Sequence, residues 1–277
     1  NLGIKKFPSA VPGAVEMGRG LPPALRRRVR RGMIRERKQP PPCGDRRGRR
    51  VREHKRQWVL VFCLAEALVY AAFLWQDLRP GGGDTTWLKY GGILLCAAFS
   101  LAWSGRGGSL LVAAAQLLTL WADWFLLVLD QHYGLGVLIF CAVQLLYFLR
   151  LYAGNGGRSL WTLRLALVMA AMAGLWGLGL FIPLNALALV YFSNFLVNVC
   201  QSWGLSGGKA RVFAAGLSLF LCCDICVGLH QFQGMLPEEA ASLVRVGMWL
   251  FYLPAQVLIS LSGLPGTIVR GDCCEDK

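Results

Sequence analysis

The chain has 277 residues, of which 55% are hydrophobic and only 16% are charged, and its mean hydropathy is +0.48. Soluble domains carry about a quarter charged residues, so this composition excludes an ordinary soluble protein and indicates a polytopic membrane protein. The formal net charge of +14 does not predict a nucleic-acid partner, because residues 1–57 hold 18 of the 29 Lys and Arg residues, whereas residues 58–277 hold 11 bases and 11 acids.

Residues 1–57 form a basic N-terminal arm that contains "LRRRVRRGMIRERK" and "GDRRGRRVREHKR". The arm is rich in Pro and Gly and lacks an apolar face, so we predict that it is disordered. Its charge favours a cytoplasmic flank that orients the first membrane helix, and contact with RNA or anionic lipid is the alternative. We predict no cleavable signal peptide, because the first apolar run begins only at Trp58.

Eight apolar segments follow the arm and are separated by short connections rich in Gly and Pro. Windows of about 19 residues predict membrane-spanning helices near 58–75, 88–103, 109–129, 134–152, 160–181, 183–203, 210–229 and 243–262. The sequence therefore predicts an all-α protein with a transmembrane domain of eight helices at residues 58–262 and a cytoplasmic tail at 263–277.

The loops set the predicted orientation. The connections on the side of the arm hold Arg106, Arg158 and Lys209, with Arg164 near the start of the fifth span, whereas the opposite loops hold mainly acids. Because positive residues favour the cytoplasmic side, we predict that both termini are cytoplasmic, and we expect a location in the plasma membrane.

Two carboxylates lie deep inside apolar segments. Asp123 and Asp224 lie 14 residues into the third and the seventh span, and both spans run outward, so the two side chains share a depth. A charged carboxylate at the centre of a membrane helix costs about 2.5–3.5 kcal/mol, and such residues are usually functional. Glu66 on the first span is a third candidate, and Lys89 at the outer start of the second span has a stem long enough to reach inward.

Polar residues also recur at helical spacing, which predicts a polar interior. Such columns serve either a functional cavity or hydrogen bonding between helices. Four spans carry them: Gln116, Thr119, Asp123 and Asp130; Gln144 and Tyr147; Tyr191, Asn194, Asn198 and Gln201; and Tyr252, Gln256 and Ser260.

The third and fourth spans resemble the seventh and eighth in the order of their polar residues, "WADWFLLVLDQH" against "LCCDICVGLHQ". This similarity predicts a parallel repeat around one cavity, and chance similarity between two apolar hairpins is the alternative. The ten cysteines do not predict a metal site, because most lie in apolar runs and none forms a zinc-binding pattern. We also expect no cofactor, because no dinucleotide or phosphate-loop motif is present.

Residues 58–262 resemble the YhhN family of eight-span membrane proteins. The resemblance rests on "WADWFLLVLD", "GLGVLIF", "VQLLYFL", "CCDICVGLHQF", "LFYLPAQVLIS" and "LKYGGILL". It implies a lysoplasmalogenase, which hydrolyses the vinyl-ether bond of lysoplasmalogens to a fatty aldehyde and a glycerophospho head group. By resemblance, Asp123 and Asp224 are the catalytic pair, without an assignment of which is the acid, and the substrate-binding residues are Lys89, Gln144, Tyr147, Tyr252 and Gln256.

The chemistry suits two carboxyl groups, because cleavage of an enol ether needs one acid that keeps its proton and one carboxylate that stabilises the resulting cation and activates water. Three positions depart from the family pattern: Gln144 stands in place of a His, Tyr90 in place of a Pro and Ala122 in place of a Gly. Gln cannot exchange protons, so a non-catalytic lipid-binding relative is one alternative. A transporter or proton-coupled carrier is the other, since carriers also contain paired intramembrane acids.

Overall fold

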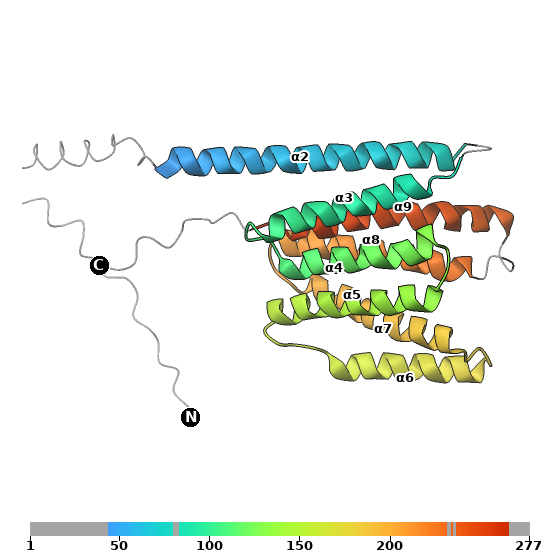
Figure 1. Ribbon diagram of the computed structural model, residues 1–277. Helices are drawn as coiled ribbons and strands as arrows, with labels where there is room; N and C mark the ends of the chain where they lie inside the picture. Colours follow the sequence, from blue (N-terminus) through green and yellow to red (C-terminus); the bar gives the residue numbers. More distant parts are fainter. Residues whose placement is uncertain (1–43, 80–82, 232–233, 235–236, 266–277) are drawn as a thin grey trace, which may run out of the picture. The chain divides into compact units, whose positions relative to one another are not determined.

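The structure is a computed structural model that describes residues 44–79, 83–231, 234 and 237–265, with side chains from residue 53 onward. The chain divides into two units, residues 1–56 and 57–277. The described residues form eight α-helices, one π-helix and no strand (Figure 1): α2 (Gly44–Asp77), α3 (Thr86–Ser104), α4 (Leu110–Asp123), η2 (Trp124–Val128), α5 (Tyr133–Gly154), α6 (Trp161–Gly177), α7 (Pro183–Trp203), α8 (Gly208–His230) and α9 (Glu238–Ser262).

The predicted all-helical membrane fold is confirmed, and each α-helix overlaps one of the eight predicted spans. Six helical segments are long and apolar enough to cross a membrane: Glu53–Asp77, Leu110–Val128, Tyr133–Gly154, Pro183–Trp203, Gly208–His230 and Glu238–Ser262. Helix α3 does not meet these criteria, and α6, with 17 residues, is too short for them. The protein is therefore a multi-pass membrane protein, while the count of eight crossings stays a prediction.

Residues 44–57, the last part of the arm that the sequence predicts to be disordered, are helical and belong to α2. The segment after Pro42 contains no further proline and is rich in Arg, which is a good helix former. It also extends an existing helix, so it bears no separate cost of helix nucleation. The rest of the predicted disordered arm, residues 1–43, and the end of the predicted tail, residues 266–277, lie outside the described residues.

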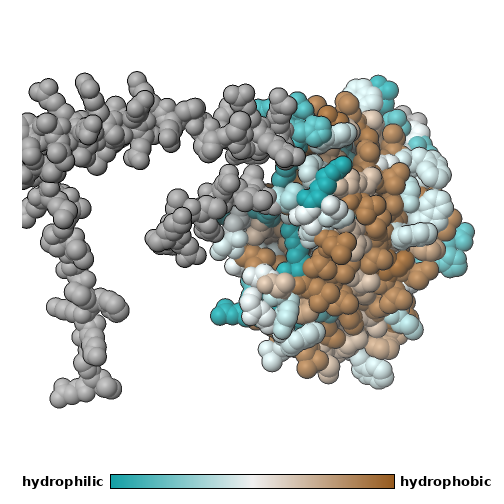
Figure 2. Space-filling view, turned by 60° about the vertical axis from the view of Figure 1, so that its left-hand side comes forward, coloured by the Kyte–Doolittle hydropathy of each residue, from teal (hydrophilic) through white to brown (hydrophobic). Residues whose placement is uncertain are grey.

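Large apolar side chains cover much of the helical surface, as the brown face in Figure 2 shows. Exposed examples come from helices along the whole chain: Leu68, Trp87, Leu110, Trp121, Leu145, Trp161, Trp176 and Leu243. Soluble monomers rarely expose contiguous apolar areas of this kind. The apolar surface is therefore the part of the protein that contacts lipid.

Helix α9 packs against α3, α4 and α8, and α7 packs against α5, α6 and α8. Gly216 allows a close approach of α8 to α9: a Cβ atom at this position would lie 3.1 Å from the backbone nitrogen of Ile259 and 3.2 Å from the carbonyl oxygen of Ala255. The two hairpins of the predicted repeat, α4–α5 and α8–α9, are both tightly packed pairs. Their relation by a repeat stays a prediction.

Pro254 lies inside α9 and has no N–H to donate to the carbonyl oxygen of Leu250 one turn earlier. The hydroxyl of Tyr70 on α2 donates to that oxygen at 3.1 Å. An irregularity within α9 is therefore satisfied by a neighbouring helix, as expected inside a bilayer.

Candidate functional site

Asp123 is the last residue of α4 and is only 5% exposed. The helix widens directly after it into the π-helical turn η2, in which the N–H of Leu129 donates to the carbonyl oxygen of Trp124 at 2.9 Å. Single π-helical turns within α-helices occur frequently at functional sites. The backbone geometry therefore marks the position that the sequence identifies by its charge.

The hydroxyl of Tyr252 on α9 donates a hydrogen bond of 2.6 Å to Oδ2 of Asp123. The tyrosine ring packs between Phe220 and Trp249, with ring centroids 5.4 and 5.5 Å away. The structure thus brings together two of the predicted site residues, Asp123 and Tyr252, from helices far apart in the sequence.

Asp224 on α8 has an equivalent partner. The hydroxyl of Tyr191 on α7 donates to Oδ2 of Asp224 at 2.5 Å. Among the ion pairs of the described residues, none involves either intramembrane aspartate. Each carboxyl group is therefore held by one tyrosine and not by a positive charge.

The two aspartate–tyrosine pairs lie at the ends of a row of aromatic rings, with successive centroids 5.9, 5.1 and 5.4 Å apart, in the order Tyr191, Phe195, Phe220 and Tyr252. No hydrogen bond within the described part of the chain joins the two carboxyl groups. Their action on one substrate in a shared pocket stays a prediction.

One turn and two turns before Asp123, Thr119 and Gln116 are fully buried on the same face of α4. The side-chain amide of Gln116 donates to Oε1 of Gln256 at 3.0 Å and to its carbonyl oxygen at 3.2 Å. Tyr147 is also buried, and its ring packs on Phe213. The predicted residues Gln256 and Tyr147 thus lie in the helical core of the described chain.

The fourth predicted binding residue, Gln144, belongs to a second polar cluster. The amide of Asn198 on α7 donates to Oε1 of Gln144 at 3.0 Å and to its carbonyl oxygen at 3.1 Å. The guanidinium of Arg164 on α6 donates in turn to Oδ1 of Asn198 at 2.8 Å and to Oε1 of Gln201 at 2.7 Å. Three helices are joined by these neutral amides and one buried cation.

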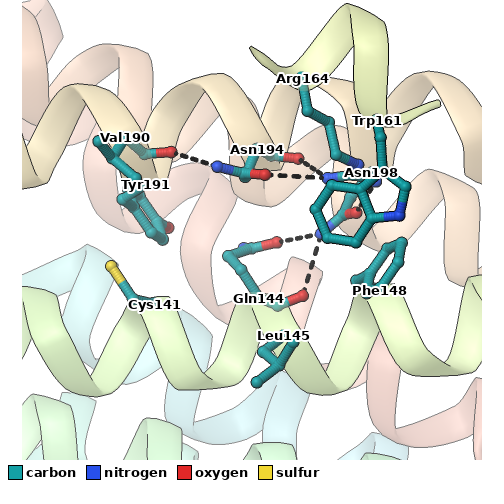
Figure 3. A pocket seen from close by; sticks show the side chains of 10 residues that line it. All are labelled: Cys141, Gln144, Leu145, Phe148, Trp161, Arg164, Val190, Tyr191, Asn194 and Asn198. Carbon is teal, nitrogen blue, oxygen red and sulfur yellow. Dashed lines mark hydrogen bonds between the residues drawn. The ribbon is translucent and has the colours of Figure 1, made fainter. Parts of the chain in front are cut away.

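A cavity of about 160 Å³ adjoins this cluster. Figure 3 shows Gln144 between Tyr191 and Asn198, with Trp161 and Phe148 beside Asn198. Ten residues line the cavity: Cys141, Gln144, Leu145, Phe148, Trp161, Arg164, Val190, Tyr191, Asn194 and Asn198. Because Tyr191 is part of this wall, the cavity borders the partner of Asp224.

Lys89 lies apart from both carboxyl groups. Its amine forms an ion pair of 2.7 Å with Asp77 at the end of α2 and lies 5.0 Å from the ring centroid of Trp249, which packs on Tyr252. The partner of Lys89 is thus Asp77, and the ring of Trp249 lies between Lys89 and Tyr252. Glu66, the third candidate carboxylate, is buried on α2 and accepts from the thiol of Cys96 at 3.3 Å.

Sequence reasoning missed the role of Arg164, which the orientation argument counts only as a positive charge near a helix start. A usable signal was its place inside the predicted span 160–181, where an uncompensated charge is expensive. Tyr191 appears in the sequence only as a member of a polar column, and no local pattern pairs it with Asp224.

Comparison with known families matches residues 85–263 to the YhhN family. Neither a curated protein nor a solved structure matches the chain significantly. The matched range extends from the start of α3 through α9, so it includes both aspartate–tyrosine pairs, the Gln116–Gln256 pair and the cavity beside Arg164. The chain therefore belongs to the YhhN family.

Proposed function

We propose that this protein is an integral-membrane hydrolase that cleaves the vinyl-ether bond of lysoplasmalogens to a fatty aldehyde and a glycerophospho head group. The observation that supports it best is that two intramembrane aspartates, Asp123 and Asp224, each accept a hydrogen bond from a tyrosine, the buried Tyr252 and the half-buried Tyr191, inside a bundle of apolar helices. Membership of the YhhN family is consistent with this reaction.

The reaction begins with the transfer of a proton from a carboxylic acid to the vinyl carbon distant from the ether oxygen, which leaves an oxocarbenium cation. The second carboxylate stabilises this cation and takes a proton from the water that adds to it. The first carboxylate then takes the hydroxyl proton of the resulting hemiacetal, the second carboxyl group gives its proton to the ether oxygen, and the bond between that oxygen and the hemiacetal carbon breaks to give an aldehyde and a free glycerol hydroxyl. One water molecule is consumed, and no cofactor is required.

Tyr191 and Tyr252 have the same task in this mechanism. A tyrosine hydroxyl that donates to one carboxyl oxygen fixes the orientation of the group and leaves its other oxygen for substrate or water. The apolar surroundings exclude bulk water, which strengthens electrostatic interactions with the developing cation. Asp224 is the carboxyl group nearer the cavity, since its partner Tyr191 lines that wall.

The direct test is release of fatty aldehyde from a purified lysoplasmalogen by the protein in detergent micelles, followed by mass spectrometry. We expect Asp123→Asn and Asp224→Asn to abolish release while each variant stays folded. Asp130→Asn is the matched control, because Asp130 is exposed and accepts a hydrogen bond from the hydroxyl of Tyr133 on the surface of the described structure. Unchanged turnover in both intramembrane variants would remove the proposal, and lipid or proton flux in liposomes without cleavage would favour a carrier.

We further propose that the protein lies in the plasma membrane with both termini cytoplasmic, as the distribution of Lys and Arg among the loops favours. Tags placed at each end should be protected from protease in intact cells and become accessible after permeabilisation. Cleavage of either tag in intact cells would reverse the assignment for that end.

A further inference from the structure

Arg164 is a buried cation whose hydrogen-bond partners among the described residues are all neutral. It is 4% exposed, and its five hydrogen bonds go to the carbonyl oxygens of Ser159 and Asn194 and to the side-chain oxygens of Asn194, Asn198 and Gln201. Its guanidinium also lies 4.7 Å from the ring centroid of Phe148. Across the described ranges no carboxylate forms an ion pair with it. A buried charge without a counter-charge is expensive, so this position favours an anion.

A second, independent feature points to the same kind of ligand. Gln144 is 3% exposed, and its amide nitrogen, Nε2, has no hydrogen-bond partner in the described part of the protein. Gln144 and Arg164 line the same cavity (Figure 3). A buried donor without an acceptor costs about 1–3 kcal/mol, which an acceptor-rich ligand would recover.

Half of the ten wall residues are apolar, namely Cys141, Leu145, Phe148, Trp161 and Val190, and this part of the wall reaches the lipid-facing surface. Leu145 on α5 and Trp161 on α6 both line the cavity, and they are 55% and 62% exposed. Helices α5 and α6 each pack on α7, which places the cavity between α5 and α6 with α7 behind it. A ligand that fits combines an anionic group with one apolar chain that leaves sideways into the bilayer.

Asn194 and Tyr191 are three residues apart on α7, which is about 5 Å along the helix axis. That is about the distance between the two ends of a glycerol backbone, from the oxygen that carries the phosphate to the oxygen of the vinyl ether. A phosphate held at Arg164 therefore leaves the first atoms of the chain close to Tyr191 and its partner Asp224.

We propose that the cavity between α5 and α6 binds the phosphate of a single-chain phospholipid, with Arg164 and Gln144 as the recognising residues. This inference rests on the proposed function and locates the substrate's phosphate. Arg164 need not move far, because its 3.3 Å bond to Oδ1 of Asn194 is its longest, and a charge-assisted bond to phosphate would replace it. Lys89, one of the substrate-binding residues implied by the family resemblance, forms an ion pair with Asp77.

The test measures binding with lipids that cannot be cleaved. A fluorescent lysophospholipid bound to the protein in nanodiscs is displaced by 1-O-hexadecyl-glycerophosphocholine, by 1-O-hexadecylglycerol without phosphate, by glycerophosphocholine without a chain, and by inorganic phosphate. We expect Arg164→Gln to weaken the first lipid at least tenfold and to leave hexadecylglycerol unchanged. We expect Leu145→Trp, at an exposed position, to weaken both chain-bearing lipids.

Arg150→Gln is the matched control, because Arg150 is another largely buried cation, bonded to Ser262 and stacked on Phe213 away from the cavity. It should leave the preference for the phosphate-bearing lipid intact. If Arg164→Gln weakens the binding of the phosphate-bearing lipid and of hexadecylglycerol equally, the assignment of phosphate to Arg164 is wrong. If inorganic phosphate displaces the fluorescent lipid as well as 1-O-hexadecyl-glycerophosphocholine does, the assignment of a lipid ligand is wrong. None of these lipids is cleaved, so the binding assay can be interpreted even if the protein does not hydrolyse lysoplasmalogens. If the protein hydrolyses lysoplasmalogens but does not bind the phosphate-bearing lipid more tightly than hexadecylglycerol, only the phosphate site is wrong and the proposed function stands.

Discussion

The Tyr252→Phe variant removes one hydroxyl group and leaves the rest of the site in place. The ring keeps its packing against Phe220 and Trp249, at 5.4 and 5.5 Å between centroids, while Asp123 loses its 2.6 Å hydrogen bond. A hydrogen bond to a charged group contributes about 1.5–3 kcal/mol. Since 1.4 kcal/mol corresponds to a factor of ten in rate, the expected loss in kcat is roughly 10- to 150-fold.

The assay is aldehyde release at saturating lysoplasmalogen, together with the midpoint of thermal unfolding in the same detergent. Tyr191→Phe removes the equivalent 2.5 Å bond to Asp224 and should give a loss of similar size. Tyr70→Phe is the control, because it removes a hydroxyl that donates at 3.1 Å to the carbonyl of Leu250 and touches neither carboxyl group.

The result that would refute the reasoning is a kcat for Tyr252→Phe equal to that of Tyr70→Phe. A fall in the unfolding midpoint with unchanged kcat would likewise assign the tyrosine to packing alone. If only one of Tyr191→Phe and Tyr252→Phe lowers kcat, one aspartate performs the chemistry and the proposed division between two carboxyl groups is wrong.

Two further predictions concern the helix contacts. Gly216→Ala should lower the free energy of unfolding by about 1–3 kcal/mol, because the new Cβ meets Ile259 and the backbone of α9. The control Gly228→Ala, on the same helix, meets nothing within 4 Å and should be neutral or slightly stabilising. Equal unfolding midpoints for the two variants would contradict this. Gln116→Leu should lower the free energy of unfolding by about 1–3 kcal/mol, because Oε1 of Gln256 loses its donor. Adding Gln256→Leu should recover much of that loss in the same measurement. Additive losses would show that the two amides do not act as a pair.

Long apolar segments predict the helices well. A chain that crosses a bilayer must pair its backbone N–H and C=O groups within one helix, and the side chains along that helix are mostly apolar because they face lipid. The polar columns are equally readable: Gln116, Thr119 and Asp123 share a face by spacing, and all three are buried. The exception on that column is Asp130, which is exposed because the chain leaves α-helical geometry at η2 before reaching it. No residue pattern in "WFLLV" signals that change.

The partners across helices were not predictable from spacing. Tyr252 lies 129 positions from Asp123, and Tyr191 lies 33 positions from Asp224, so each pairing depends on which helices become neighbours. A single sequence contains the faces of the helices but not their order around the bundle. Arg164 illustrates the same limit, since the charge that suggests a cytoplasmic flank is in fact buried among amides from α7.

Gln144, which by family resemblance stands in place of a His, bears on binding more than on proton transfer in the proposed mechanism. Gln144 accepts from Asn198 and lines the cavity beside Arg164, and no hydrogen bond within the described residues connects it to either aspartate. The two groups that exchange protons in the proposed reaction, Asp123 and Asp224, are both present with their own tyrosine donors. The substitution therefore removes no proton carrier from the mechanism, and its effect should fall on recognition of the head group, where an uncharged amide donor replaces an imidazole.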